Sequence, residues 1–105
     1  MVMNKLMILI TTVPTRSLAD SISKLLIERK LAACVSIKEI SSSYIWQEKY
    51  VQENEIELTV KSTPENLNNL TKILQENITY EVPQLIYKIF DSEINYFNWV
   101  KESVR

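Results

Sequence analysis

Two stretches of alternating residues, 31–46 and 53–61, constrain the fold more than any other feature of the sequence. An apolar residue recurs at every second position, namely Leu31, Ala33, Val35 and Ile37 in the first stretch and Ile56, Leu58 and Val60 in the second. This period of two is typical of β-strands that turn one face toward a core. Polar residues 47–49 predict a turn between the stretches, so the two strands are expected to form one long hairpin.

The length of this hairpin predicts a partner subunit. A strand over residues 31–46 spans about 53 Å, whereas a compact globule of this chain length is only roughly 33 Å across. The hairpin must therefore bend or protrude, and a protruding hairpin has unpaired edges. Its second face carries Ala32, Cys34 and Thr59, which form neither a clean core nor an ordinary solvent surface. We therefore expect the chain to oligomerise.

The residues before the hairpin predict one strand and one helix. The short apolar run over residues 6–10 is bounded by Thr and Pro residues and favours a buried strand. Apolar residues at helical spacing follow from Ser17, where Ser17-x-x-Asp20 resembles a capping box. The charged residues 28–30 are expected to end this helix.

The residues after the hairpin predict a helix, a strand and a last helix. Residues 63–65 read Thr-Pro-Glu, which is typical of a helix start, and this helix is expected to run to about Asn77. Residues 85–90 predict a strand, and Asp91 and Ser92 are expected to cap the last helix. Its inward-facing residues are expected to be Ile94, Phe97, Val100 and Val104.

The predicted order of elements is β-α-β-β-α-β followed by a terminal helix. This order defines an α+β fold with the plan of a ferredoxin-like sandwich, in which two helices cover one face of a sheet. The other face of the sheet is expected to stay open. The length of the chain predicts a single domain over residues 1–105.

The charge balance and the missing residue types exclude several functions. Twelve Lys and Arg residues against thirteen Asp and Glu residues give a net charge of -1, which leaves no basic face for nucleic acid or an anionic membrane. The chain has no His and no Gly, so it builds neither a Ser-His-Asp triad nor a glycine-rich phosphate loop. Because no nucleophile–base pair or metal triad can be named, we do not expect an enzyme.

The same composition predicts a cytoplasmic location. Cys34 is the single cysteine and cannot form an intrachain disulfide, which fits a reducing compartment. The apolar run over residues 6–10 is far too short to span a membrane, and no cleavage site of small residues follows it.

Five short motifs follow one another over nearly the whole chain. They are residues 30–35 (KLAACV), Ser42-x-Tyr44-x-Trp46, Glu55-x-x-Leu58-x-x-Lys61-Ser62, residues 80–84 (YEVPQ) and Tyr96-Phe97-x-Trp99. Taken together and in this order, they resemble the CutA divalent-cation tolerance proteins. The resemblance implies a ferredoxin-like subunit in a tight homotrimer with the architecture of PII signalling proteins. It also implies a role in the tolerance of copper or other divalent cations.

The positions related to copper differ from the family pattern. Members discussed as copper binders often carry a Cys late in the first strand and one or two His residues before the fourth. The corresponding residues here are Thr11, Asn77 and Ile78. Thr and Asn oxygens are poor copper ligands compared with imidazole or thiolate. We therefore expect weak metal binding, and a divalent cation such as copper is implied as a cofactor by the resemblance alone.

Two kinds of ligand site remain open. Lys61 and Tyr80, with Glu55 as a further candidate, are expected to hold a small anion in a cleft that the resemblance places between subunits. Alternatively, Lys61 forms an ion pair with a Glu of a neighbouring subunit. For a metal ion, the candidates are the thiol of Cys34 and the carboxylates of Glu53, Glu55 and Glu57, which fall on one strand face.

Each metal candidate also has a structural interpretation. Cys34 fits a small residue in a packed region, and the three carboxylates fit a solvated face or one paired with Lys61. The large side chains of Tyr44, Trp46 and Trp99 are expected to pack at the trimer interface. The predicted function is a trimeric binding or regulatory module in divalent-cation tolerance, and the alternative is a PII-like sensor of a small molecule or partner protein.

Overall fold

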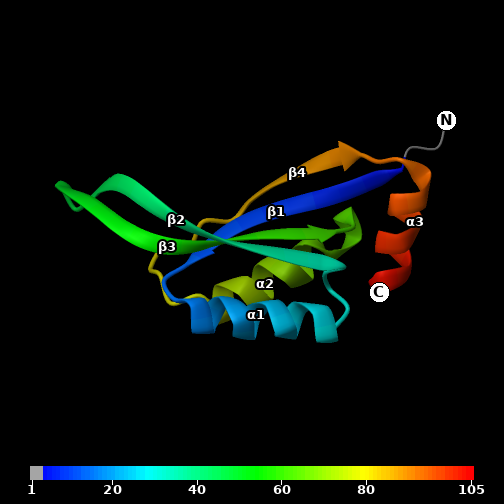
Figure 1. Cartoon of the computed structure of the whole chain (residues 1–105), viewed down its shortest axis with the longest axis horizontal. Coiled ribbons are helices and arrows are strands. Elements are labelled where there is room, and N and C mark those ends of the chain that lie inside the picture. Colours follow the sequence, from blue (N-terminus) through cyan, green and yellow to red (C-terminus); the bar gives the residue numbers. More distant parts are fainter. Residues whose placement is uncertain (1–3) are drawn as a thin grey trace.

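The computed structural model describes residues 4–105 and contains one antiparallel sheet of four strands. The strands lie in the order β2-β3-β1-β4, and α1 and α2 lie side by side below the sheet in Figure 1. The elements are β1 (Lys5–Val13), α1 (Arg16–Glu28), β2 (Cys34–Trp46), β3 (Lys49–Ser62), a 3-10 turn (Pro64–Asn66), α2 (Leu67–Asn77), β4 (Ile86–Asp91) and α3 (Ile94–Ser103). The predicted order of strands and helices and the α+β class are confirmed.

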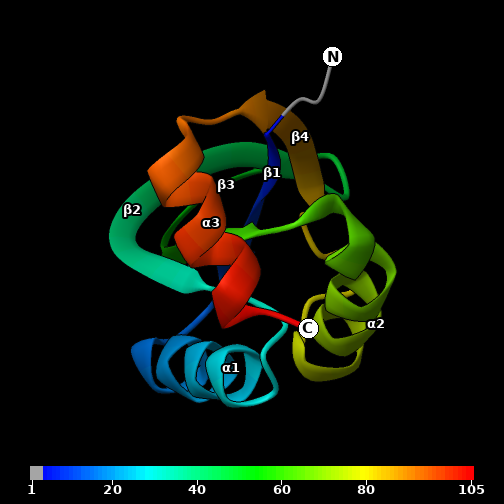
Figure 2. The same ribbon diagram turned by 90° about the vertical axis from the view of Figure 1, so that its right-hand side faces the viewer.

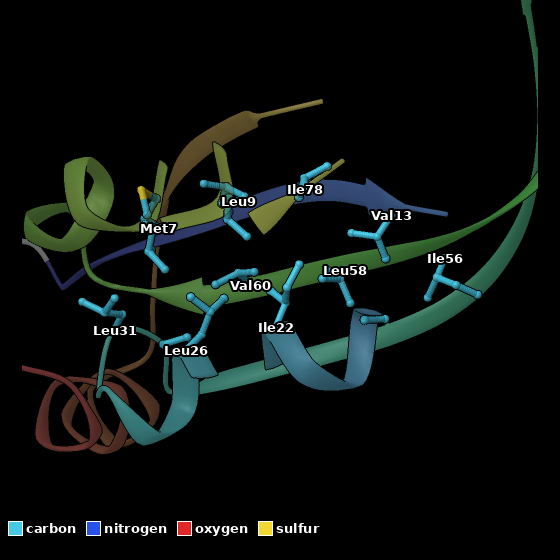
Figure 3. Packing of buried hydrophobic residues seen from close by; sticks show 14 residues of the cluster. Met7, Leu9, Val13, Ile22, Leu26, Leu31, Ile56, Leu58, Val60 and Ile78 are labelled. Atoms are coloured by element: carbon cyan, nitrogen blue, oxygen red, sulfur yellow. The ribbon is translucent and has the colours of Figure 1, made fainter. Parts of the chain in front are cut away.

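The core lies between the sheet and the two helices. Leu9 of β1 pairs with Val60 of β3, and Figure 3 shows both side chains on the side of the sheet where Ile22 of α1 lies. All three side chains are almost completely buried. In Figure 2, α3 lies across the end of the sheet, where its Val100 is buried.

The hairpin of β2 and β3 protrudes, as its length predicts. Its pairing is continuous from Cys34↔Lys61 to Trp46↔Lys49. Figure 1 shows the tip extending well beyond the helices, and the chain measures 49 × 27 × 22 Å. Gln47 and Glu48 form the turn with φ of 51° and 67°. Two successive positive φ angles match the right-handed twist of the flanking strands, although glycine is usual at such positions.

The start of β2 differs from the prediction. The strand begins at Cys34. The preceding residues Leu31 and Ala32 are both buried, whereas consecutive residues of a half-buried strand alternate between the core and the solvent. Lys30 has a φ of 58°, its N–H donates to the Ile27 carbonyl, and the Leu31 N–H donates to the Leu26 carbonyl. These bonds form a Schellman motif, which ends α1 and turns the chain toward the sheet.

The predicted caps of the first and last helices are also wrong by one or two residues, and the predicted start at residues 63–65 forms the 3-10 turn, after which α2 begins at Leu67. The hydroxyl of Thr15, rather than Ser17, accepts a hydrogen bond from the Leu18 N–H and caps α1. Asp91 ends β4, and the carboxylate of Glu93 caps α3. That carboxylate accepts bonds from two N–H groups of the first turn, which lower its pKa.

The predicted inward face of α3 is only partly correct. Val100 is buried, whereas Ile94 is 48% exposed in the isolated chain. Phe97 and Val104 are half-buried. The helix therefore packs on the sheet through its second half, and its first turn presents an apolar residue to the surroundings.

Candidate functional site

A groove of about 560 Å³ lies where the hairpin meets the segment between α2 and β4. That segment is yellow to gold in Figure 1. The hairpin contributes two aromatic and two acidic side chains, and the end of β1 contributes Thr12. The lining residues of the hairpin are Tyr44, Trp46, Glu53 and Glu55, and those of the segment are Thr79, Tyr80, Glu81, Val82 and Gln84.

Glu55 and Tyr80 form the central contact of the groove. The Tyr80 hydroxyl donates a hydrogen bond of 2.8 Å to Oε1 of Glu55. Glu55 as a residue is only 8% exposed. Burial of Tyr80 raises the pKa of its hydroxyl above the usual 10, and the bond to the Glu55 carboxylate raises it further. Within residues 4–105, Glu55 forms no ion pair with a Lys or Arg. The groove therefore contains a carboxylate that has no positive partner among the residues that the structure describes.

Tyr44 and Glu53 repeat this pairing nearer to the hairpin tip. Glu53 pairs across the hairpin with Ser42, so Tyr44 is its diagonal neighbour and the Tyr44 hydroxyl donates to Oε1 of Glu53. This hydrogen bond raises the pKa of Tyr44 to about 12. Each of the two carboxylates is thus held by a phenol from a different part of the chain.

The chemistry of the lining favours a positively charged ligand. Glu53, Glu55 and Glu81 contribute carboxylates, and no Lys or Arg of the described part of the chain lines the groove. Tyr44, Trp46 and Tyr80 add aromatic surface. Carboxylates donate no hydrogen bonds when ionised, so a ligand that carries N–H groups or a positive charge fits them, whereas an anion is repelled.

The predicted partnership of Lys61 and Tyr80 does not occur within one chain. Lys61 lies six residues from Glu55 along β3, which is about 20 Å in an extended strand. Its register partners are Ile8 and Cys34. A cleft that joins Lys61 to Tyr80 would need a second subunit, and it stays a prediction.

The metal candidates do not gather into one site within the chain. No three His, Cys, Asp or Glu side chains in the part of the chain that the structure describes lie close enough to hold a metal ion. Glu57 faces Lys38 across the hairpin, whereas Glu53 and Glu55 are engaged by tyrosines. Cys34 is a free, half-exposed thiol at the far end of the hairpin. Whether copies of these residues meet in an oligomer stays a prediction.

The predicted interface residues are exposed in the isolated chain. Tyr44, Trp46 and Trp99 keep between 38% and 48% of their surface, and Trp99 lies against Tyr96 with ring centroids 5.7 Å apart. Their place in a trimer stays a prediction. The sequence did not predict that Tyr44 and Trp46 share a groove with Tyr80, because no local spacing relates the hairpin to a segment about 35 residues later. The YEVPQ motif at residues 80–84 was the available signal.

Comparisons with known proteins agree with the fold and the motifs. Residues 7–103 match the family described as CutA1 divalent ion tolerance protein. A divalent-cation tolerance protein CutA of Thermus thermophilus is 33% identical over 98 residues, which cover 91% of this chain and 95% of that protein. A chloroplastic CutA protein of Arabidopsis thaliana is 34% identical over 96 residues, which cover 90% of this chain and 53% of that protein.

Solved structures resemble the chain closely. CutA from Synechococcus elongatus superposes with a TM-score of 0.92 at 34% identity and covers 97% of this chain and 92% of its own. A periplasmic divalent cation tolerance protein CutA from Archaeoglobus fulgidus gives 0.91 at 28% identity, with 95% and 99% covered. No helix within residues 4–105 is both long and apolar enough to cross a membrane.

Proposed function

The chain belongs to the CutA1 divalent ion tolerance family, and from that membership we propose that it is a homotrimeric, non-enzymatic binding module in the response to divalent cations. Residues 1–105 act as one domain in this proposal, and the groove at Glu55 and Tyr80 is its ligand site. The observation that supports it most is Glu55, a residue only 8% exposed whose carboxylate lines the groove and has no positive partner within residues 4–105.

The exposed apolar side chains support the trimer. Large apolar residues lie exposed along the edge strand β4 and at the hairpin tip, where water would otherwise cover them. They include Ile45, Tyr50, Ile86, Tyr87 and Phe90. A PII-like arrangement, in which each hairpin packs on a neighbouring subunit, would bury such surfaces. Lys61 would then face a neighbour rather than the groove of its own chain.

The proposed location is the cytoplasm. It depends on the single cysteine, Cys34, which fits a reducing compartment. Relatives named as periplasmic and chloroplastic show that members of the family also occur in other compartments.

Growth under excess divalent cations tests this function. A bacterial strain that lacks its own CutA protein would receive the wild-type chain, Glu55→Gln or Glu57→Gln. Glu57→Gln is the matched control, because Glu57 lies two residues away on β3 and does not line the groove. We expect the wild type and the control to restore growth in excess copper or zinc, and Glu55→Gln to fail. Equal rescue by all three chains would refute the groove as the functional site.

A further inference from the structure

We propose that the ligand of the groove is a small organic cation with an ammonium or guanidinium head group. This inference deepens the proposed function, because it uses the same groove and names the chemical class of its ligand. Three observations support it, namely the size of the groove, the charge of its lining and its aromatic walls.

The size of the groove fits a molecule better than a bare metal ion. A volume of about 560 Å³ falls within the range of about 300 to 1,000 Å³ that is usual for small-molecule sites. A metal ion needs several ligand atoms that converge on one point, and no three suitable acidic or sulfur-bearing side chains converge within residues 4–105.

The charge of the lining favours a positive ligand. Oε1 of Glu55 accepts the Tyr80 hydroxyl, whereas Oε2 accepts no hydrogen bond from residues 4–105. Oε2 is not among the buried polar atoms that lack a partner and it belongs to a residue that lines the groove, so a bound cation can reach this oxygen. Ammonium and guanidinium groups carry several N–H donors, which form strong charge-assisted hydrogen bonds to carboxylates.

The aromatic walls add a second attraction for organic cations. Within one chain, Tyr44, Trp46 and Tyr80 line the groove together with Glu53 and Glu55, and the first two are also expected to border the trimer interface. The face of an aromatic ring attracts a cation through its quadrupole, and Trp does so most strongly. An organic cation with an apolar stem gains binding energy from contact with this aromatic surface, whereas a hydrated divalent metal ion gains much less.

Tryptophan fluorescence provides the test. The chain has two tryptophans, so Trp99→Phe leaves Trp46 in the groove as the single reporter. We would titrate this variant with putrescine and with agmatine at constant ionic strength, and repeat the titration on the wild type by calorimetry. We expect a saturable change in Trp46 emission. Butanol and succinate are the neutral and anionic controls, and neither should cause it.

Charge variants show whether the signal arises in the groove. Glu55→Gln keeps the shape and the hydrogen-bond acceptor but removes the charge, and we expect it to weaken amine binding by about tenfold or more. Glu57→Gln should leave the affinity unchanged. If both variants bind equally, the signal arises elsewhere and the inference is wrong.

Two other outcomes would overturn the inference and identify a different occupant. If divalent metal ions give a Glu55-dependent signal and the amines give none, the groove binds metal and the proposed function survives without the organic ligand. If no ligand binds and Glu55→Gln lowers the oligomeric mass, a Lys or Arg side chain of a second copy occupies the groove. In that case both the inference and the groove's role as a ligand site fail.

Discussion

Removal of the Tyr80 hydroxyl is expected to destabilise the fold measurably. Tyr80→Phe keeps the aromatic ring but deletes the donor of the 2.8 Å hydrogen bond to Glu55, a residue only 8% exposed. A hydrogen bond to a charged group contributes about 1.5 to 3 kcal/mol, and a buried acceptor left without its donor also loses hydration. We therefore expect the free energy of unfolding to fall by about 2 kcal/mol. For a domain of this size, that loss corresponds to a thermal midpoint lowered by about 10 °C.

A double-mutant cycle isolates the contribution of the charge. Glu55→Gln retains an acceptor for the Tyr80 hydroxyl and removes a carboxylate that has no positive partner within residues 4–105, so this single change is expected to be neutral or stabilising. In that background, Tyr80→Phe breaks a bond between neutral groups and should cost only about 1 kcal/mol. The coupling energy between the two residues is therefore expected to be about 1 kcal/mol.

Urea denaturation at neutral pH and one fixed protein concentration measures these energies, because the stability of an oligomer depends on concentration. The matched control is Tyr50→Phe, which removes an exposed hydroxyl that contacts Ser43 at the hairpin tip. It should change stability by less than about 0.5 kcal/mol. If Tyr80→Phe is as mild as this control, the Glu55–Tyr80 contact does not form in solution and the electrostatic reasoning about the groove is wrong.

Four further outcomes are expected. Light scattering in dilute buffer should give three times the subunit mass of 12.3 kDa, and a monomeric mass would contradict the proposed trimer. Calorimetry should find no submicromolar Cu(II) site, and any residual binding of soft metals should disappear in Cys34→Ser. A tight site that survives this change would contradict the reasoning from ligand types. The phenols of Tyr44 and Tyr80 have raised pKa values in the folded chain, so their stabilising contribution is complete below pH 10 and is lost as the pH rises further. The ultraviolet absorbance of phenolate should show that both ionise at a higher pH than a free tyrosine. Replacement of both by Phe should flatten the loss of stability above pH 10. Lys30→Gly should raise the free energy of unfolding by about 1 kcal/mol in thermal or urea denaturation, because Lys30 has a φ of 58° and glycine adopts that conformation without strain. An unchanged midpoint would show that the Lys30 side chain compensates for the strain.

The fold was largely predictable because the period of the apolar residues changes at each element. The alternation around Leu58 and the helical spacing after Ser17 both placed elements correctly. The boundaries failed where local hydrogen bonds override the period. Leu31 and Ala32 continue the alternation into the preceding loop, but the Schellman motif at Lys30 buries both residues before the strand begins.

The candidate site was less predictable, because it joins residues that are distant in sequence. Lys61, Tyr80 and Glu55 were named together for a cleft between subunits, and the sequence did not indicate which of the two β3 residues meets Tyr80 within one chain. The choice between them depends on the point along β3 that the segment before β4 reaches. In the structure that point lies at Glu55, so the groove within one chain is acidic, and a contact of Tyr80 with Lys61 of another subunit stays a prediction.

The position of the groove also bears on the missing copper ligands. The resemblance places those ligands at position 11 and at positions 77–78. In this chain Thr11 and Ile78 are buried toward the core, whereas the next residues along the chain, Thr12 and Thr79, line the groove. Successive residues of a strand point to opposite faces of its sheet, so a donor at position 11 of β1 would point away from the groove. Replacement of the copper ligands by Thr11, Asn77 and Ile78 therefore leaves the acidic and aromatic lining of the groove intact, and binding of a cation there does not require the missing donors.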